Sequence, residues 1–347
     1  MILSICDESG RLSKGLCLVA EHGALGTLGK TRIVDDVAYI GKPSRLFDDS
    51  DEQYTAGIIP VPRPIHLPLK SLSLKVLGLA AGRAHSLILT SEGVFTLGNN
   101  GYGQCGRPII GNEEYAQSRV VHHIPNVKGE NITGVAASQD HSILLTEKGR
   151  VYTFGWGADG QTALAHYKNE WQPSLVKGDL TDKGKVFGWG NSEYGQLPGK
   201  GDNHEINIAT ELVIPSEVGH VVDIAAGGSF CMLLNSTGNV YVWGYGILGF
   251  GPEVLTVDKP TLIPPTLFGA NPYDKNLKVS KICCGISHLG AVTNTGDLYM
   301  WGRNKFGFLG LGNRNDQFFP LKVAIGAQVK RVACRVDHTV TLCKPFI

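Results

Sequence analysis

The sequence predicts an all-β protein, a β-propeller whose repeating unit is about 55 residues long. Three observations lead to this prediction. The chain matches itself four times, a glycine marks the same turn in each copy, and 45 glycines and 17 prolines among 347 residues supply many turns. The four full copies align at residues 76–106, 132–164, 221–251 and 279–310.

Each copy has the same order of features. A step of small residues such as Ala80-Ala81-Gly82 comes first, usually followed by a histidine and an alternating apolar segment. A tight turn that ends in glycine then leads into a second segment, which closes with an aromatic residue and a glycine. Alternation is typical of a β-strand with one buried face, and glycine supplies the positive φ of a short hairpin. Each copy therefore predicts hairpins followed by a glycine-rich turn.

The hairpin glycines set the period. The interval from Gly93 to Gly149, from Gly184 to Gly238 and from Gly238 to Gly296 is in each case about 55 residues. A unit of this size holds about four strands, which is the content of a propeller blade. We therefore predict a single propeller domain over residues 1–347.

The two ends of the chain complement each other. Residues 329–347 repeat the inner strands without the outer ones, whereas residues 17–29 carry an outer-strand turn without inner strands. Pairing these two halves would close a ring and remove two sheet edges.

Two places depart from the period. The interval from Gly149 to Gly184 is about 20 residues shorter than the period, so the blade that contains the turn at 181–184 lacks its inner half. A further blade is expected between Glu52 and Tyr54 and is absent. We therefore count six outer turns, with one blade missing and one incomplete.

The incomplete blade leads to an expectation about burial. Without inner strands, the segment 185–189 would have no inner partner within its own blade. We expect Phe187 and Trp189 to be more exposed than Tyr241 and Trp243, their equivalents in a complete blade.

Two strings, at 101–106 and 244–249, spell G-x-G-x-x-G. A dinucleotide-binding loop of that form follows a strand and opens a helix. Prolines between positions 252 and 265 rule out a regular helix after the second string, and the first string fits no better. Both are predicted to be turns between outer strands. The string GTLGKT at 26–31 lacks the first glycine of a phosphate loop and is not assigned to one.

Composition argues against several function classes. The net charge is +1 and no run of five like charges occurs, so binding of nucleic acid through a basic tail is not expected. No apolar stretch approaches the roughly 18 residues of a membrane span. Eight cysteines without C-x-x-C spacing favour buried thiols in a reducing compartment. Residues 1–16 include Asp7 and Glu8 and resemble at most the remnant of a transit peptide.

Several side chains recur once per copy. The histidines are candidates for a metal ring or for catalytic bases, but Phe230 replaces one of them. We favour a structural role, in which each histidine caps its turn and hydrogen-bonds the backbone of its own or the next blade. Tryptophans at strand ends are predicted to pack between blades, and Cys283 and Cys284 to be small buried residues. The histidines are His85, His141, His288 and His338, and the tryptophans are Trp156, Trp189, Trp243 and Trp301.

Inserted segments are the candidate binding loops, because repeat proteins often bind partners through them. The pair His122-His123 beside Arg119 is either a polar contact or part of a solvated loop. Ser138 and Arg335 occupy positions where the repeat has glycine, and Arg335 is a candidate for the central channel. The segments that depart from the strand pattern are 107–124, 198–216 and 252–277.

The repeat resembles that of the regulator-of-chromosome-condensation family. The strings GRAHSLILT (82–90), WGADGQT (156–162) and WGYGILG (243–249) carry the likeness, which extends from about Cys17 to Ile347. The resemblance implies a seven-bladed propeller and is strongest to a mitochondrial member of the family.

The resemblance implies two classes of function. The first is a non-enzymatic scaffold, peripheral to the matrix side of the mitochondrial inner membrane. Such a scaffold would work with the large ribosomal RNA, its pseudouridine synthase module, ribosome assembly and translation. The second is a guanine-nucleotide exchange factor for a mitochondrial fusion dynamin-like GTPase. The wedge with which the founding member acts on its GTPase has no counterpart here that we can match residue by residue.

The sequence has no enzyme signature of its own. No Ser/His/Asp set, no E-x-x-H motif and no paired carboxylates on one element stand out. We therefore assign no catalytic, cofactor-binding or metal-ligating residue, and we expect no cofactor.

Overall fold

The structure is a computed structural model. It describes residues 2–4, 38–39, 64–65, 76–82, 84–111, 121–178, 180, 185–198, 205–274, 276–334 and 339–345. Antiparallel sheets dominate, and the described helices are two short 3-10 turns, η1 (Ser216–Val218) and η2 (Pro265–Phe268). This confirms the all-β fold class.

The chain divides into two compact units. Unit 2 holds residues 16–158 and 164–177, and unit 1 holds the remainder of the chain. Each unit is described by itself, and the single domain over 1–347 stays a prediction.

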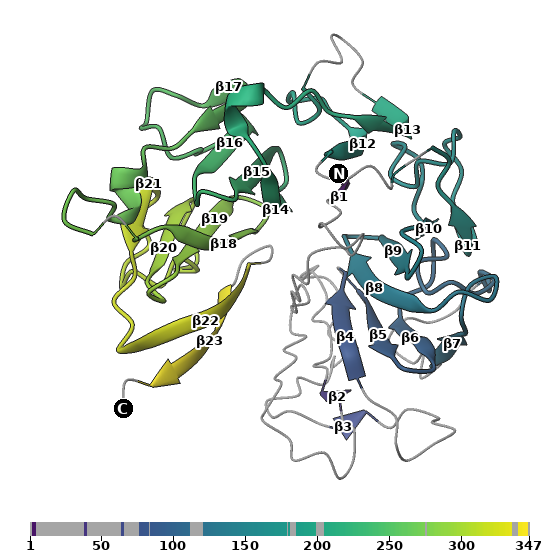
Figure 1. The fold of residues 1–347 in the computed structure, drawn as a ribbon. Helices are drawn as coiled ribbons and strands as arrows, with labels where there is room; N and C mark the ends of the chain where they lie inside the picture. The colour runs from purple at the N-terminus through teal and green to yellow at the C-terminus, as the bar shows by residue number, and fades with distance from the viewer. Residues whose placement is uncertain are drawn as a thin grey trace, which may run out of the picture. The chain divides into compact units, whose positions relative to one another are not determined.

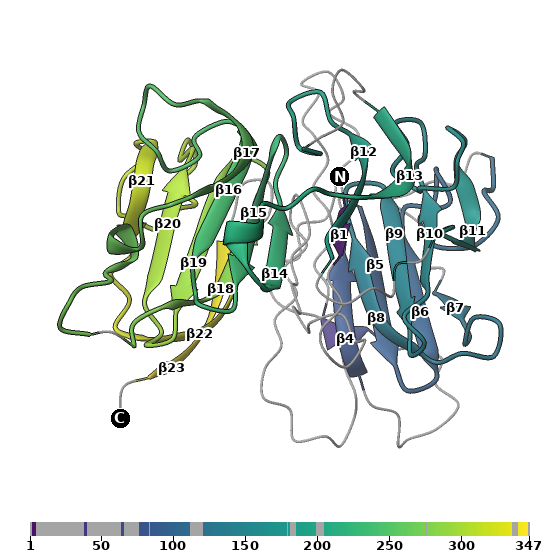
Figure 2. The same cartoon turned by 45° about the horizontal axis from the view of Figure 1, so that its top comes forward.

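Four sheets have four strands each (Figure 1). Their strands stay side by side in the rotated view (Figure 2). Each full copy of the repeat supplies the first three strands of one sheet, and the fourth strand follows the copy. Unit 2 contains β4 (Val76–Ala81), β5 (His85–Thr90), β6 (Gly93–Gly98) and β7 (His122–Ile124), then β8 (Ile132–Ala137), β9 (His141–Thr146), β10 (Val151–Gly155) and β11 (Glu170–Leu175). Unit 1 contains β14 (Val221–Ala226), β15 (Phe230–Asn235), β16 (Val240–Tyr245) and β17 (Thr256–Leu262), then β18 (Val279–Cys284), β19 (His288–Thr293), β20 (Leu298–Gly302) and β21 (Gln317–Lys322).

The second strand of each four-stranded sheet is buried along its whole length. All six residues of β5, β9, β15 and β19 are buried. The expectation of a single buried face is therefore wrong for these strands. A strand buried on both faces needs a nearly continuous apolar run, which HSLILT at 85–90 and HSILLT at 141–146 supply.

The predicted glycine turns are confirmed. Gly238 has φ +88° in the hairpin between β15 and β16, a conformation that favours glycine. Gly244 is the last residue of β16 that pairs with β15, and it has φ +105°. A Cβ there would lie 2.4 Å from the carbonyl oxygen of Ser229. A bulge in the pairing of β16 with β17 accompanies it. The string 244–249 leads to the strand β17 rather than to a helix, as predicted.

The outermost strands correct the prediction about inserted segments. β7, β17 and β13 (Glu205–Glu211) lie within the segments 107–124, 252–277 and 198–216, which the sequence suggested to be free of strands. Only one residue of β17 is buried, so this strand lacks the apolar alternation that identifies a strand. Proline occurs within three outermost strands, at Pro173, Pro260 and Pro320, where a missing amide costs no ladder hydrogen bond.

The last half-copy folds as predicted for inner strands alone. β22 (Ala327–Cys334) pairs with β23 (Thr339–Pro345) in a sheet of two strands. The segment 17–29, the turn at 181–184 and the expected blade near Glu52 lie outside the described residues. A further two-stranded sheet joins β2 (Ala38–Tyr39) and β3 (Pro64–Ile65).

The incomplete blade gains a strand that the sequence did not suggest. β12 (Phe187–Asn191) pairs with β13 on one side and with β1 (Ile2–Ser4) on the other, with Leu3 opposite Gly188. The expectation of greater exposure is wrong. Phe187 is 8% exposed against 7% for Tyr241, and Trp189 is as fully buried as Trp243.

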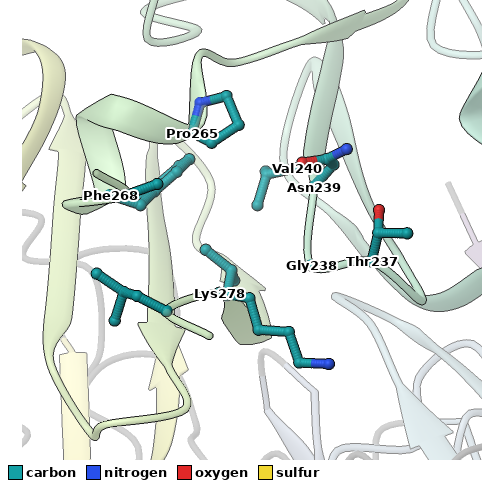
Figure 3. Close-up of a pocket in the computed structure, with 10 residues that line it drawn as sticks. Thr237, Gly238, Asn239, Val240, Pro265, Phe268 and Lys278 are labelled. Atoms are coloured by element: carbon teal, nitrogen blue, oxygen red, sulfur yellow. The ribbon is translucent and has the colours of Figure 1, made fainter. Parts of the chain in front are cut away.

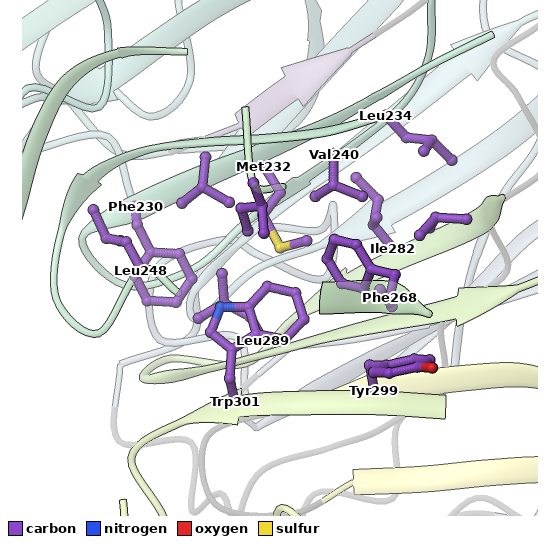
Figure 4. Packing of buried hydrophobic residues seen from close by; sticks show 14 residues of the cluster. Phe230, Met232, Leu234, Val240, Leu248, Phe268, Ile282, Leu289, Tyr299 and Trp301 are labelled. Carbon is purple, nitrogen blue, oxygen red and sulfur yellow. The ribbon is translucent and has the colours of Figure 1, made fainter. Parts of the chain in front are cut away.

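Cores form between neighbouring sheets of the same unit. In unit 1, Trp301 and Leu289 from one blade pack with Met232 and Phe230 from the other, and Phe268 of η2 closes the cluster (Figure 4). In unit 2 the corresponding cluster includes Leu87, Leu144 and Phe154. Each blade therefore buries its apolar faces against another blade.

The pairing of β1 predicts the effect of removing the first strand. In a chain that lacks residues 1–4, β12 becomes an edge strand, and its amides should exchange hydrogen about 10-fold faster or more. Hydrogen exchange followed by mass spectrometry measures this, with the amides of β16 as the internal control. Equal exchange of β12 in both chains would show that β1 does not hold the blade.

Candidate functional site

The recurrent histidines contact hydroxyl groups of the neighbouring sheet. In unit 2, the His85 Nε2 atom lies 2.9 Å from the Ser142 hydroxyl. That hydroxyl donates to the carbonyl oxygen of Gln104, so the imidazole is the donor to Ser142. In unit 1, His288 Nε2 lies 3.1 Å from the Thr339 hydroxyl. The prediction of a structural role holds, but the side-chain partner is a hydroxyl rather than the backbone.

The pairing of these histidines with a hydroxyl group of the next copy also explains why phenylalanine replaces one of the histidines. Ser142 directly follows His141, and Thr339 directly follows His338. In the copy after the one that contains Phe230, the corresponding residue is Leu289. Leucine offers no hydroxyl, and Phe230 packs with Leu289 in one apolar cluster. The first residue of the second strand therefore varies together with its partner in the next blade.

His141 is the exception. Its Nε2 atom is buried and has no hydrogen-bond partner among the described residues. The copy that follows it in the sequence lacks its inner half, and with it the position of the hydroxyl. Burial lowers the pKa of His141 well below the usual 6.5, so the ring is neutral. His338 lies outside the described residues.

The small-residue step before each histidine forms a tight turn. The Gly82 amide donates to the His85 carbonyl oxygen at 2.8 Å, and the Ser138 amide donates to that of His141 at 3.0 Å. Ser138 therefore keeps the turn without glycine. A Cβ at Gly82 would lie 2.1 Å from the His85 ring, which explains the glycine there. Arg335 lies outside the described residues.

Two tryptophans join neighbouring segments as predicted, and a third differs. The indole nitrogens of Trp189 and Trp243 donate to the carbonyl oxygens of Gln161 and Gln196, at 2.9 and 2.8 Å. Trp156 follows the strand-ending glycine instead of preceding it, and buried Phe154 occupies the tryptophan position. Placing Trp156 with the other tryptophans was therefore wrong.

Trp156 belongs to a different feature, an aromatic pair between loops. Its ring meets Tyr102 edge to face at 4.5 Å in unit 2. The equivalent pair in unit 1 is Tyr194 and Tyr245, stacked at 5.3 Å. In both pairs one residue follows the strand-ending glycine directly and the other lies four residues after such a glycine. Alignment on these glycines would have shown the pairs, because both positions repeat.

The pair in unit 1 is open to solvent. Tyr194 is 43% exposed and Tyr245 is 44% exposed. Phe306 occupies the four-residue position in the last full copy and is 62% exposed, with the Lys305 ammonium 5.4 Å from its ring centre. Large exposed aromatic side chains at repeated positions mark a surface for binding. We call Tyr194, Tyr245 and Phe306 the aromatic surface.

The remaining candidate residues are the histidine pair with Arg119 and the two adjacent cysteines. His123 stacks on Phe95 and its Nε2 lies 3.0 Å from the Glu92 carbonyl oxygen, whereas burial and Arg107 lower the pKa of His122. Arg119 lies outside the described residues. Cys283 is buried as predicted, but Cys284 is half-buried.

A pocket beside the β15–β16 hairpin has a volume of about 40 Å³, room for only a few water molecules (Figure 3). Its lining includes Gly238, Phe268 and Lys278. Within the described ranges, no group of three or more His, Cys, Asp or Glu side chains could hold a metal ion. In the same ranges, no helix is long and apolar enough to cross a membrane.

The hydroxyl contacts predict unequal effects of one substitution. His85→Phe removes a buried hydrogen bond and should cost about 1–3 kcal/mol of unfolding free energy. His141→Phe removes an unpartnered polar atom and should change it by less than about 1 kcal/mol, because phenylalanine already serves at position 230. Urea unfolding of both variants measures the difference. Equal losses of unfolding free energy would contradict the role of the hydroxyl partner.

Comparisons with known proteins match this architecture. The sequence model of the "Regulator of chromosome condensation (RCC1) repeat" matches residues 91–145, 183–234, 237–292 and 295–342. The mouse "RCC1-like G exchanging factor-like protein" is 46% identical over 92% of this chain and 74% of its own length.

Solved structures share the fold. The crystal structure of human WBSCR16 has a TM-score of 0.86 at 43% identity, covering 94% of this chain and 86% of that one. Yeast Prp20p, described with its binding properties to Gsp1p and histones, has a TM-score of 0.69 at 19% identity, covering 94% and 82%, and shows the fold alone. The repeats, the sheets and these matches agree, and the chain belongs to the regulator of chromosome condensation (RCC1) repeat family of β-propellers.

Proposed function

We propose that this propeller is a binding scaffold whose contacts include the aromatic surface. The observation that carries the proposal is the stacked pair Tyr194–Tyr245, nearly half exposed, with Tyr245 at the end of β16 and Tyr194 in the loop after β12. Burying large side chains gains free energy, so leaving them in water at repeated positions favours a partner that covers them.

The partner that we propose is the large mitochondrial ribosomal RNA together with its pseudouridine synthase module. Aromatic faces stack on unpaired bases, and nearby cations pair with phosphates. Arg303 and Lys305 lie in the loop that carries Phe306, and the Arg303 side chain is largely exposed. These local charges fit an RNA contact without a basic tail.

The proposed location is the matrix side of the mitochondrial inner membrane, with the protein peripheral to the bilayer. The support is the resemblance of the sequence to a mitochondrial member of the family, together with the 46% identity to the mouse relative. There the scaffold would serve ribosome assembly and translation.

A second candidate is guanine-nucleotide exchange on a dynamin-like GTPase of mitochondrial fusion. The name of the mouse relative, which contains the words G exchanging factor-like, is what favours it. Exchange requires an element that displaces the nucleotide. The sequence contains no counterpart that we can match, residue by residue, to the wedge of the founding member, and for that reason we rank exchange second.

The aromatic surface predicts which variants lose RNA binding. Tyr194→Ala and Tyr245→Ala should each weaken binding of transcribed large mitochondrial ribosomal RNA by about 5- to 140-fold, since stacking on one base is worth roughly 1–3 kcal/mol. Filter binding at a fixed salt concentration measures the affinity. Tyr273→Ala is the matched control, because Tyr273 is 98% exposed and lies outside the aromatic surface. Unchanged affinity in all three variants would exclude the surface as an RNA contact.

The ranking of the two candidates predicts the outcome of an exchange assay. The purified chain should leave the release of labelled GDP from the dynamin-like GTPase, and from Ran, at the intrinsic rate. Fluorescence of the labelled nucleotide follows the release, with EDTA as the positive control because it removes the Mg²⁺ that holds the nucleotide. Clear acceleration by the chain would reverse our order.

A further inference from the structure

Two cysteines from neighbouring sheets of unit 1 lie side by side. Cys283 is on β18 and Cys334 is the last residue of β22, and their exposed fractions are 6% and 2%. Their sulfur atoms are 2.8 Å apart. A disulfide bond has a length of about 2.05 Å, so a small movement would bring the two atoms to bonding distance.

The surroundings favour the reactive form of one thiol. Cys283 and Cys334 lie in an apolar cluster with Val292 and Met300. Burial raises the pKa of the Cys334 thiol, but hydrogen bonds from Cys283 and His288 outweigh it and lower that pKa from 9.0 to about 6. A thiolate is the nucleophile in cysteine oxidation.

The other cysteines of this region differ from the pair. Cys284 follows Cys283 on the same strand, and successive residues of a strand point to opposite faces. Cys343 on β23 donates to the Thr341 hydroxyl at 3.5 Å. The contact between sulfur atoms is the one between Cys283 and Cys334, which belong to different sheets.

We propose that Cys283 and Cys334 are a site of oxidative modification, at which a peroxide converts the two thiols into a disulfide that joins β18 to β22. The Cys334 thiolate attacks one oxygen of hydrogen peroxide, the O–O bond breaks, and the leaving hydroxide takes a proton to become water. The resulting sulfenic acid is attacked by the Cys283 sulfur, the S–O bond breaks, and a second water leaves. The two thiols lose two electrons and two protons, and the peroxide is reduced to two waters.

The peroxide reaches the pair through opening of the hairpin. β22 and β23 form a sheet of only two strands, and such a hairpin is marginally stable by itself. Local opening exposes Cys334 while the four-stranded sheet that holds Cys283 stays folded. The disulfide then closes a loop between cysteines 51 residues apart and holds the hairpin against its neighbour.

Peptide mapping tests the proposal directly. The purified chain is treated with hydrogen peroxide, free thiols are alkylated, and the protein is digested with trypsin without reduction. We expect a linked pair of peptides, residues 282–303 and 332–335, that separates on reduction. Recovery of both peptides in alkylated, unlinked form would overturn the proposal.

Variants identify the sulfur atoms, because Cys283 and Cys284 share one peptide. Cys283→Ser and Cys334→Ser should abolish the link, whereas the matched control Cys284→Ser should keep it. Loss of the link in Cys284→Ser with retention in Cys283→Ser would assign it to the wrong cysteine and overturn the proposal.

A second measurement needs no variant. Amides of residues 327–345 should exchange about 10-fold more slowly or more in the oxidised wild-type chain than in the reduced one, because the link opposes hairpin opening. Amides of β9 in the other unit are the control. Equal exchange in the hairpin would show that no such link forms.

Discussion

The structure depends on strands that are apolar on both faces. β5, β9, β15 and β19 have no exposed residue, so each sheet must be covered from both sides. A sheet of four strands cannot do this alone, and the clusters around Trp301 and Phe154 lie between sheets rather than within one. Repetition is therefore a requirement of the burial pattern, since within each unit one blade covers a face of another.

Polar pairs accompany the apolar contacts between neighbouring sheets. His85 with Ser142 and His288 with Thr339 are buried hydrogen bonds between sheets, and Phe230 with Leu289 is the apolar alternative. Placing histidine beside leucine would leave a buried nitrogen without a partner, which is unfavourable. The residue that faces each of these positions in the next copy is therefore matched to it in polarity.

The repeat order, the hairpin glycines and the terminal half-copy were predictable from the sequence, because glycine with positive φ and apolar runs leave local signals. β1 was not predictable, since so short a strand has no period of its own and its partner β12 lies in a distant part of the sequence. The outermost strands were missed because they are largely solvated, and solvation removes the apolar alternation.

For the candidate site, the structural role of His85 was predictable because phenylalanine replaces histidine in one copy. Its hydroxyl partner was not, because the bond crosses to another copy. The aromatic pairs Tyr102–Trp156 and Tyr194–Tyr245 were missed for a simpler reason. Trp156 was aligned with Trp243 by residue type, whereas the glycine beside each shows that they occupy different positions.

The prolines of the outer strands have a consequence for how this protein meets other molecules. An exposed strand edge is a template on which a further strand can assemble, in aggregation as well as in recognition of extended peptides. Pro173, Pro260 and Pro320 each remove an amide donor from that edge. The outer edges of these three strands are therefore poor sites for pairing with an added strand. Recognition at these blades is left to side chains on the connecting loops.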